Sequence, residues 1–300
     1  MKKLLKWIGV SLATLVAIAL VGLATIIFVG GRKLSAERTL APEIVGSVSV
    51  PVDAASIERG AHLAATRCVF CHGEDLGGKK FIDDASFMLL NAPNLTRGGG
   101  GVGAHYADDT AWVRSIRHGL NPQGRALIIM PSEVFYYLSD EDLGSLVAYL
   151  KSLPPIDRSW AAPQPAIVAK ALVGAGVLTS AVPFLGMDHQ APRPAAPAPG
   201  ATAEYGEYIA RSFGCASCHG KELSGQLTPG PKKFLAGNLT PGGPLKDWNE
   251  ELFLKMVHER VHEEMPWGML RSMHDLEQRA LWRFLAAQPA RASTGVAGES

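Results

Sequence analysis

The chain opens with a long apolar segment. Three lysines within the first six residues precede an uncharged run from Trp7 to Gly31. A helix of that length spans about 37 Å, enough to cross a hydrocarbon core of ~30 Å with some tilt. We therefore expect residues 1–33 to form an N-terminal transmembrane anchor. A cleaved signal peptide is the alternative, although its apolar region is usually only about 7–15 residues long and ends in a small-x-small site, which this run lacks.

The rest of the chain contains an internal repeat. Three motifs occur twice in the same order: Cys-x-x-Cys-His-Gly at 68–73 and 215–220, Asn-Leu-Thr at 94–96 and 238–240, and Met-Pro at 130–131 and 265–266. A repeated series of motifs indicates two copies of one structural unit. We predict two tandem domains, over residues 53–156 and 202–290, followed by a loose tail over 291–300.

Both copies have the same helical pattern. A first helix leads into the cysteines, over residues 57–66 and 205–213, and a middle helix follows Asp108 in the first copy. The last helix of the first copy begins after Ser139, which suits an N-cap, with Asp142 three residues on as the acid of a capping box. No segment reads as a β-strand, so the predicted fold class is all-α.

The segment between the copies, residues 157–201, carries seven prolines and is rich in alanine. This composition is typical of an extended, semi-rigid tether, and we predict a Pro/Ala-rich linker. Residues 171–187 within it are uncharged, which raises the alternative of a second membrane span. That stretch is at the short limit for a span and contains both glycine and proline. We expect instead a helix that packs on the protein or lies at the membrane interface.

Charge and cysteine content exclude several classes of protein. The 29 basic and 28 acidic side chains leave a net charge of +1, which argues against nucleic-acid binding. Four cysteines in 300 residues are too few for a disulfide scaffold. The positive-inside rule keeps the N-terminal lysines in the cytoplasm. We therefore expect a single-pass protein of the inner (cytoplasmic) membrane, with everything after residue 33 in the periplasm.

The cysteine pairs have the spacing of haem attachment sites. Cysteines at i and i+3 and a histidine at i+4 share one helical face, so two sulfurs can bond to a porphyrin while the imidazole reaches its iron. A four-cysteine zinc site and a thioredoxin-like redox pair are the alternatives. Each pair has its own histidine, and no βαβ setting surrounds it. We predict two covalently bound haem c groups, held by Cys68, Cys71 and His72 and by Cys215, Cys218 and His219.

A methionine is predicted as the second axial ligand of each iron. Met130 and Met265 hold equivalent positions in the repeat, each followed by a proline. A thioether opposite a histidine raises the reduction potential, which suits an electron carrier. Met269 and Met273 lie near Met265 and are alternative ligands in the second copy.

The remaining histidines are expected at the surface or at helix caps. They are His62, His105, His118, His189, His258, His262 and His274. His258 and His262 are four residues apart on one helical face, so a metal bound by this pair is an alternative.

The first copy resembles a class I cytochrome c. The resemblance is carried by Glu58-Arg59-Gly60 before the cysteines, Pro93-Asn94-Leu95 after them, the lone Met130, and the stretch from Leu146 to Lys151. It implies that Gly60 lets the first helix approach Tyr149 on the last helix. It also implies that the carbonyl of Pro93 accepts a bond from the ring N–H of His72. The equivalent residues of the second copy are Gly206 and Phe284 at the crossing, and Gly237 beside His219.

The tandem, anchored arrangement is similar to the dihaem cytochrome subunits that accompany membrane dehydrogenases. The resemblance implies a transmembrane helix followed by two class I cytochrome c-like domains. Our hypothesis is a membrane-anchored dihaem c-type cytochrome, an electron carrier and not an enzyme. It would relay single electrons between a periplasmic or membrane donor and an acceptor, its redox partners being a dehydrogenase, a quinol-oxidising complex or an oxidase. The alternatives are a dihaem peroxidase-like enzyme and a dedicated cytochrome subunit of a dehydrogenase or oxidase complex.

Overall fold

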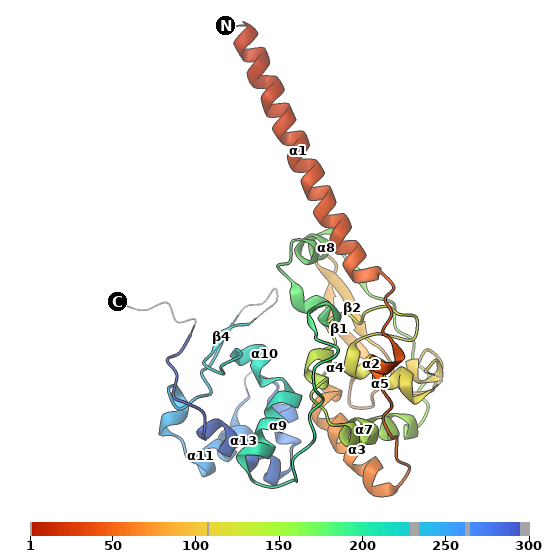
Figure 1. Cartoon of the computed structure of the whole chain (residues 1–300), viewed down its shortest axis with the longest axis vertical. Helices are drawn as coiled ribbons and strands as arrows, with labels where there is room; N and C mark the ends of the chain where they lie inside the picture. The colour runs from red at the N-terminus through yellow and green to blue at the C-terminus, as the bar shows by residue number, and fades with distance from the viewer. Residues whose placement is uncertain (1, 107, 229–233, 262–264, 295–300) are drawn as a thin grey trace.

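The computed structural model of the protein describes residues 2–106, 108–228, 234–261 and 265–294. These residues are mostly helical and fall into three parts (Figure 1). One long helix, α1 (Lys2–Ser35), projects from two groups of shorter elements. We call residues 36–201 the first unit and residues 202–294 the second unit.

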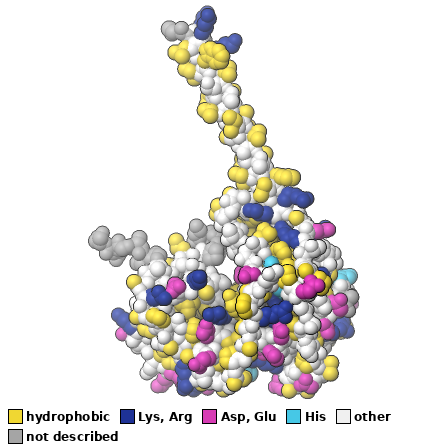
Figure 2. All heavy atoms as spheres, in the orientation of Figure 1, with side chains coloured by type: hydrophobic (Ala, Val, Ile, Leu, Met, Phe, Trp, Pro, Cys, Tyr) yellow, Lys and Arg dark blue, Asp and Glu magenta, His cyan; other side chains and the backbone are white. Residues whose placement is uncertain are grey.

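Helix α1 is the one helix in the described part of the chain that is long and apolar enough to cross a membrane. Its most apolar stretch has a mean hydropathy of 2.8, and none of that stretch is buried against the protein. Figure 2 shows apolar side chains along the exposed length of the helix. It is therefore not a core helix, and its length and composition fit a membrane span or a signal sequence.

The first unit is built on two crossing helices, α3 (Ala54–Arg67) and α7 (Asp140–Ser152). The side chain of Ser139 caps α7 by accepting a bond from the N–H of Asp142, which confirms the predicted N-cap. Leucines from both helices form the centre of the buried core. The shorter helices are α2 (Pro42–Val45), α4 (Val69–His72), η1 (Val102–Ala104), α5 (Asp109–His118) and α6 (Ser132–Phe135).

The second unit is built on the crossing of α9 (Ala203–Phe213) and α13 (Asp275–Ala286). Its core also lies at the crossing, where Ile209 of α9 and Leu281 of α13 are buried. The shorter helices are α10 (Cys215–His219), η4 (Pro244–Asp247), α11 (Glu250–Glu259) and α12 (Trp267–Arg271).

A glycine sits at the crossing in each unit. A Cβ on Gly60 would lie 2.0 Å from the carbonyl oxygen of Ser145 and 2.7 Å from Cβ of Tyr149. A Cβ on Gly206 would meet Ala280 and Phe284 at the same two distances. The predicted close approach of glycine to an aromatic residue on the last helix is thus confirmed in both units.

The expectation that the chain contains no strands is wrong, although the strands are short. In the first unit β1 (Lys79–Asp84) pairs with β2 (Met88–Ala92), which pairs in turn with β3 (Gln164–Pro165), all antiparallel. In the second unit β4 (Gln226–Leu227) pairs with β5 (Leu235–Ala236). Alternate residues of β2 are buried, the period-two pattern of a strand. The sequence does not show this pattern, because Met88, Leu89 and Leu90 are all apolar.

The linker is not a free tether, because polar and apolar contacts fix it to the first unit. The indole N–H of Trp160 donates to the carbonyl of Gly77 over 2.9 Å. The hydroxyl of Tyr136 donates to the carbonyl of Ala191 over 2.7 Å, and Arg193 donates to two carbonyls in α2. Between these contacts lie α8 (Ile167–Gly174), η2 (Thr179–Ala181) and η3 (Pro183–Gly186). The uncharged part of the linker therefore packs on the protein. This was one of the two arrangements that we expected, the other being a helix at the membrane interface.

Part of the expected tail is also held in place. The backbone N–H of Thr294 donates to the carbonyl of Ser224 over 3.0 Å, and the carbonyl of Arg291 accepts from the side chain of Asn238 over 2.8 Å. Residues 295–300 lie outside the described residues.

The two units meet through equivalent helices. His62 of α3 has its Nε2 atom 2.6 Å from Oε2 of Glu277 in α13, and the hydroxyl of Tyr208 in α9 donates to Oδ2 of Asp142 in α7 over 2.6 Å. In the repeat, His62 corresponds to Tyr208 and Asp142 to Glu277. Each unit therefore offers a side chain of its first helix to the acid of the other unit's last helix. The contact has the reciprocal character of a two-fold interface.

The same two acids bind a second residue within their own unit. Arg59 donates to both carboxylate oxygens of Asp142 over 2.8 Å, and the hydroxyl of Tyr205, its equivalent, lies 3.4 Å from Oε1 of Glu277. Arg59 also crosses the boundary to Glu277 over 3.1 Å. Both acids are buried. We call these six residues the interface cluster: Arg59, His62, Asp142, Tyr205, Tyr208 and Glu277.

The capping-box role predicted for Asp142 is wrong. Its carboxylate accepts from Arg59 and Tyr208, and the backbone N–H of Ser139 donates to the hydroxyl of Tyr208 over 3.1 Å. A residue of the second unit thus satisfies the donor that a capping box would have satisfied locally.

Candidate functional site

In both units the Cys-x-x-Cys-His motif forms a single helical turn. Cys68 is the N-cap of α4, and the N–H of His72 donates to the carbonyl of Cys68 over 2.9 Å. Helix α10 starts at Cys215 itself. The glycine that follows each histidine has a positive φ, +82° for Gly73 and +83° for Gly220. The turn therefore ends in a backbone conformation that favours glycine. One turn places the two sulfurs and the imidazole on one face.

Each histidine is held by one ring nitrogen. Nδ1 of His72 lies 2.9 Å from the carbonyl oxygen of Pro93, and Nδ1 of His219 lies 2.7 Å from that of Gly237. A carbonyl can only accept, so Nδ1 carries the proton and Nε2 keeps its lone pair. Burial lowers the pKa of both imidazoles, which the bond to the carbonyl opposes. Both rings are therefore neutral at pH 7, the form that binds metals.

The cysteines are unlike those of a redox dithiol. None of the four forms a disulfide. Burial raises the pKa of Cys68 and Cys215 to about 12 and that of Cys71 to about 11. A reactive cysteine needs a lowered pKa, because the thiolate is the nucleophile. The thioredoxin-like alternative is therefore disfavoured.

Metal sites built from clustered ligands find no support in the described residues. Within them, no group of three or more His, Cys, Asp or Glu side chains is placed to hold a metal ion. The four-cysteine zinc alternative is therefore disfavoured as well. His262, one half of the predicted His258–His262 pair, lies outside the described residues.

One candidate methionine packs against the core of each unit, as does a cysteine of the motif. Met130 contacts the buried core of the first unit together with Cys68 and Val69. Met265 contacts the core of the second unit, which includes Cys215. Met273 is itself part of that core and only 5% exposed, which is the environment of a packing residue.

The backbone just before Met130 is strained. Ile129 has φ of +64°, a left-handed conformation that is unusual for a β-branched residue and costs on the order of 1–3 kcal/mol. Its N–H donates to the carbonyl of Ala181 in η2 over 3.0 Å, so the linker holds the strained turn in place. Leu76 and Leu223, at equivalent positions after the two motifs, share a φ of +56°. Strained residues cluster at functional sites, and these three flank the predicted haem ligands.

One polar atom near Met265 was not anticipated from the sequence. The indole N–H of Trp267 is buried and has no hydrogen-bond partner among the described residues. A buried donor without a partner is costly, and a haem carboxylate is an acceptor of the kind it lacks. With neutral histidines, protonated thiols and a nearby thioether, the residues present in both units fit covalently bound haem c.

Two histidines are not where we expected them. His118 is fully buried, its Nδ1 lies 3.1 Å from Nδ1 of His189, and burial lowers its pKa to about 3. His62 belongs to the interface cluster, and its ring stacks on that of His274 with centroids 3.9 Å apart. His274 is the N-cap residue of α13, as a capping role requires.

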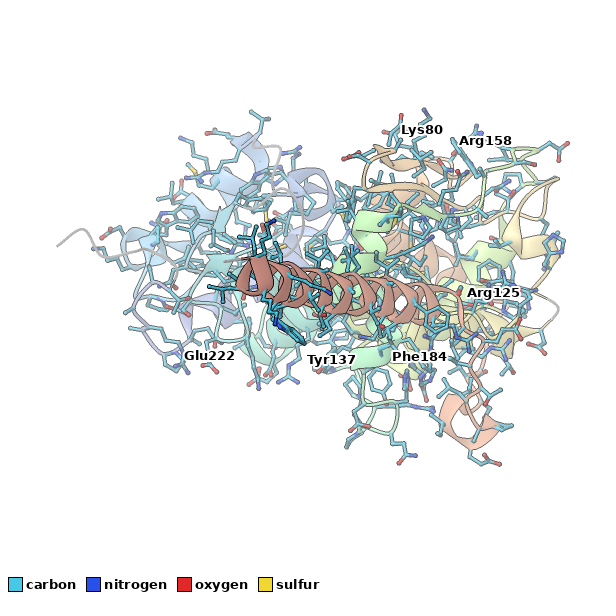
Figure 3. All side chains as sticks on the ribbon, turned by 90° about the horizontal axis from the view of Figure 1, so that it is seen from above. Lys80, Arg125, Tyr137, Arg158, Phe184 and Glu222 are labelled. Carbon is cyan, nitrogen blue, oxygen red and sulfur yellow. The ribbon has the colours of Figure 1, made fainter. Side chains whose placement is uncertain are left out.

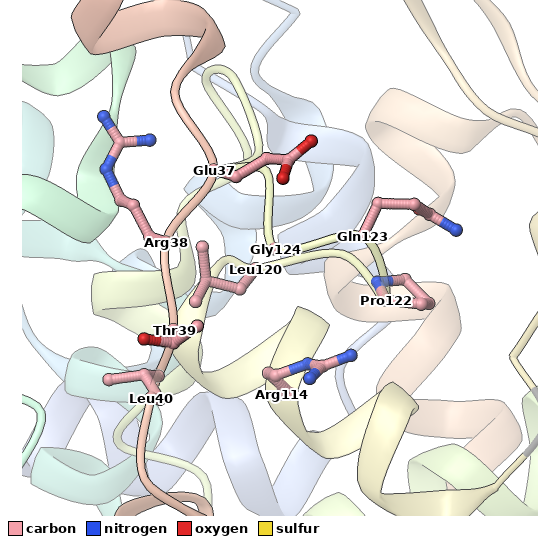
Figure 4. A pocket seen from close by; sticks show the side chains of 9 residues that line it. All are labelled: Glu37, Arg38, Thr39, Leu40, Arg114, Leu120, Pro122, Gln123 and Gly124. Atoms are coloured by element: carbon pink, nitrogen blue, oxygen red, sulfur yellow. The ribbon is translucent and has the colours of Figure 1, made fainter.

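A pocket of about 290 Å³ lies at the base of α1 (Figure 4). Its lining runs from Glu37 to Leu40 on one side and from Leu120 to Gly124 on the other, with Arg114 below. None of the predicted haem-binding residues lines it, so it is separate from the candidate site.

Comparison with known proteins bears on the first unit. Residues 55–150, about a third of the chain, match the family described as cytochrome C oxidase, cbb3-type, subunit III. No curated protein matches the chain. The matched segment contains the first Cys-x-x-Cys-His turn, the Pro93 carbonyl and Met130, and a cytochrome c domain implies covalently bound haem c. Residues 55–150 therefore match a cytochrome c domain, which supports a c-type cytochrome, and an apolar N-terminal helix precedes them.

Proposed function

We propose that the chain is a membrane-anchored dihaem c-type cytochrome that relays single electrons in the periplasm. The observation that carries the proposal is the repetition of one geometry. Both units have a Cys-x-x-Cys-His turn, a buried histidine whose Nδ1 donates to a loop carbonyl, and a methionine against the same core. The family match covers residues 55–150 of the first unit, and the shared geometry supports the same assignment for the second.

The residues divide into attachment, axial and supporting roles. Cys68, Cys71, Cys215 and Cys218 would form the thioethers, and His72, Met130, His219 and Met265 would bind the irons. Haem supplies a one-electron couple when bound, and its potential is set by the axial ligands and burial. The carbonyls of Pro93 and Gly237 fix the histidine tautomer and strengthen the ligand.

Retention of α1 as an anchor is supported by its packing. A Cβ on Gly30 would lie 1.8 Å from the carbonyl oxygen of Lys170 in α8, and a Cβ on Gly174 would lie 2.0 Å from that of Ile26. Glycines on both helices thus permit a close contact that neither helix could make with a larger residue. Leu34 is buried in the core beneath. A signal sequence that is removed has no use for such a contact, so we propose an inner-membrane location with the two haem units in the periplasm.

Haem stoichiometry and ligand identity test the proposal. Protein from a host competent in cytochrome maturation should contain two haems per chain by alkaline pyridine spectra. Met130→Ala and Met265→Ala should each remove the low-spin methionine signature of one haem only. One haem per chain, or two variants with unchanged optical and magnetic spectra, would refute the dihaem assignment or the proposed ligands.

A second candidate function is favoured by the family match. The matched family is named for a subunit of a cbb3-type oxidase, which supports the alternative of a dedicated cytochrome subunit in an oxidase complex. Purification in mild detergent distinguishes a dedicated subunit of a complex from an independent electron carrier. A stable stoichiometric complex with an oxidase or dehydrogenase supports the subunit, whereas a free chain that still exchanges electrons supports the independent carrier.

A further inference from the structure

The contact between α1 and α8 fixes the depth of α8 relative to any membrane that α1 crosses. It involves residues 26–30 of α1, and Lys6 is the last charged residue before the apolar run. At 1.5 Å per residue, the contact lies about 30–36 Å from Lys6 along the helix. A hydrocarbon core is ~30 Å thick. With Lys6 at one face of the bilayer, α8 therefore lies at the other face, where acyl chains meet headgroups.

Among the residues that the structure describes, protein covers only one side of α8. Ala169 and Val173, four residues apart, are buried against the core of the first unit. On the outer side Ile167 is 66% exposed and Val168 is 53% exposed. The turn that follows continues this apolar surface through Val177, which is 70% exposed. A helix with one face in water normally carries polar residues there, yet α8 has a single charged residue, Lys170.

Basic side chains surround the same place. Arg32 and Lys33 lie in the last turn of α1, and Nζ of Lys33 donates to the carbonyl of Val173 over 3.3 Å. Figure 2 shows basic side chains gathered at the base of α1. Arginine and lysine beside an exposed apolar surface match a bilayer interface, where the stems lie along acyl chains and the charges meet phosphates.

The base of α1 is tied to the first unit at several points. The backbone N–H of Arg38 donates to the carbonyl of Gly124 over 2.7 Å, and its guanidinium lies 5.7 Å from the ring centroid of Phe184. Arg125 pairs with Glu37. Figure 3 views the molecule from above, from the end at which α1 projects, and shows Arg125 and Phe184 close to the carboxyl end of the helix. The surface of α8 is therefore held against the first unit and cannot turn away from the membrane.

We propose that α8 and the turn through Val177 form a second membrane contact, with Ile167, Val168 and Val177 inserted into the headgroup region of the periplasmic leaflet. This inference rests on the proposed membrane anchoring by α1. Two contacts fix an orientation that one helix alone would leave free. The bilayer thus holds the first haem unit in a set pose for exchange with a membrane-bound redox partner.

Spin labelling of the full-length holoprotein tests this contact. Attachment of haem consumes the four native cysteines, so single cysteines can be labelled at Val177→Cys, Leu15→Cys and Val52→Cys. Leu15 is exposed and lies about 14 Å from Lys6 along α1, near the middle of the bilayer. Val177 and Val52 are matched, because both are exposed valines, at 70% and 90%. Val52 precedes α3, which Figure 1 places at the far end of the molecule from α1. Each variant is reconstituted in vesicles of phosphatidylethanolamine and phosphatidylglycerol, and collision with oxygen is compared with collision with a water-soluble nickel chelate.

The three labels separate the outcomes. Labels on both Val177→Cys and Leu15→Cys should favour oxygen several-fold over the label on Val52→Cys, because oxygen partitions into lipid. A lipid signal at position 15 with a water signal at position 177 would overturn the second contact and leave the anchor intact. A water signal at position 15 would refute the anchor and the inference with it. A label at position 177 shielded from both reagents would show that a second copy of the chain covers this surface, and would also overturn the proposal.

Discussion

The two units share a helix crossing and differ in the loops that connect it. Both have a glycine at the crossing, a Cys-x-x-Cys-His turn after the first helix and a leucine at φ +56° after that turn. In the first unit β1 and β2 form a hairpin of six- and five-residue strands, whereas β4 and β5 have two residues each. The second unit is thus a trimmed version of the first.

The extra residues of the first unit lie where α1 and α8 dock. Residues 119–129 separate α5 from Met130, whereas only 260–264 separate α11 from Met265. Leu120 and Ala126 from this longer loop are buried with Leu34 of α1 and Val173 of α8. The β1–β2 hairpin covers the same buried side of α8 one turn earlier, where Met88 packs with Ala169.

This difference shows what each part of the repeat is for. The elements common to both units lie beside the predicted haem ligands, and the elements present only in the first unit hold α1, the proposed anchor. The same inserted loop ends at the strained Ile129 and Met130. In the first unit, therefore, the contacts of the proposed anchor and a proposed haem ligand share one loop. A substitution at a feature that the units share should lower the stability of both units equally. A substitution at a feature that they do not share should affect the two units differently.

The largest effect should come from the shared crossing. A Val side chain at Gly60 or Gly206 would clash with backbone that cannot rotate away, so Gly60→Val and Gly206→Val should each lower the free energy of unfolding by about 3 kcal/mol or more. Urea unfolding followed by haem absorbance measures this loss. Gly268→Ala is the control, because its added Cβ meets no atom within 4 Å in the part of the chain that the structure describes. Unequal losses at Gly60 and Gly206 would contradict the equivalence of the two crossings.

Breaking the interface cluster should have the next largest effect. Burial alone would raise the pKa of the Glu277 carboxyl, but His62, the backbone N–H of His274 and Arg59 outweigh it and lower the pKa to about 2. Glu277→Gln removes the charge that these groups bind and should cost about 2 kcal/mol. Asp83→Asn is the control, since Asp83 pairs with Lys80 on the open surface.

The same carboxyl predicts a pH dependence. A carboxyl whose pKa is lower in the folded than in the unfolded protein stabilises the fold above the unfolded value, near 4.5, and this stability is lost as the pH falls toward 2. His62 and His274, Arg59, Tyr205 and the second acid Asp142 face the same cluster, so the test is the difference between wild type and Glu277→Gln. The variant should lose less stability than wild type between about pH 4.5 and 2. Parallel curves would show that Glu277 has an ordinary pKa.

The sequence predicted those parts of the candidate site and fold whose residues lie within one helical turn of each other. Attachment of haem requires Cys, Cys and His within one turn, and an N-cap requires a side chain such as Ser139 beside the first free N–H groups, so both could be predicted from spacing alone. The β2 strand was missed because it is short and because Met88, Leu89 and Leu90 form an apolar run with no alternation, which does not distinguish a strand from a helix.

The interface cluster could not be predicted in this way. Arg59 and His62 look like surface residues of α3, and their partner Glu277 lies more than 200 residues away. Their burial depends on how two folded units meet, which no local pattern encodes. The prediction that the linker is an extended tether was wrong for a related reason. Its proline content indicates stiffness, but whether a stiff segment lies free or on a surface depends on distant partners such as Gly77.

A smaller effect should distinguish two tyrosines of the cluster. The hydroxyl of Tyr208 donates to Asp142 and accepts from the buried N–H of Ser139, whereas that of Tyr205 has one long bond, 3.4 Å, to Glu277. Tyr208→Phe leaves a buried donor unsatisfied and should cost about 1–2 kcal/mol, while Tyr205→Phe should cost less than about 0.5 kcal/mol. Urea midpoints of the two variants measure the difference. Equal losses of stability would show that the hydrogen bonds of Tyr208 to the first unit contribute no more than the single long bond of Tyr205.

The smallest effect concerns the carbonyl that holds each proximal histidine. Pro93 is stiff, whereas Gly237 leaves the unfolded second unit more freedom to lose on folding. No atom of the described residues lies within 4 Å of a Cβ added to Gly237, and its φ is outside the left-handed region. Gly237→Ala should therefore raise the free energy of unfolding by about 0.5 kcal/mol, with no change in the haem spectrum because the carbonyl stays in place. Gly220→Ala is the contrasting variant, since φ there is +83° and alanine would be strained. A loss of stability in Gly237→Ala would mean that the loop beside His219 needs the freedom of glycine, and that the second unit is not simply a looser copy of the first.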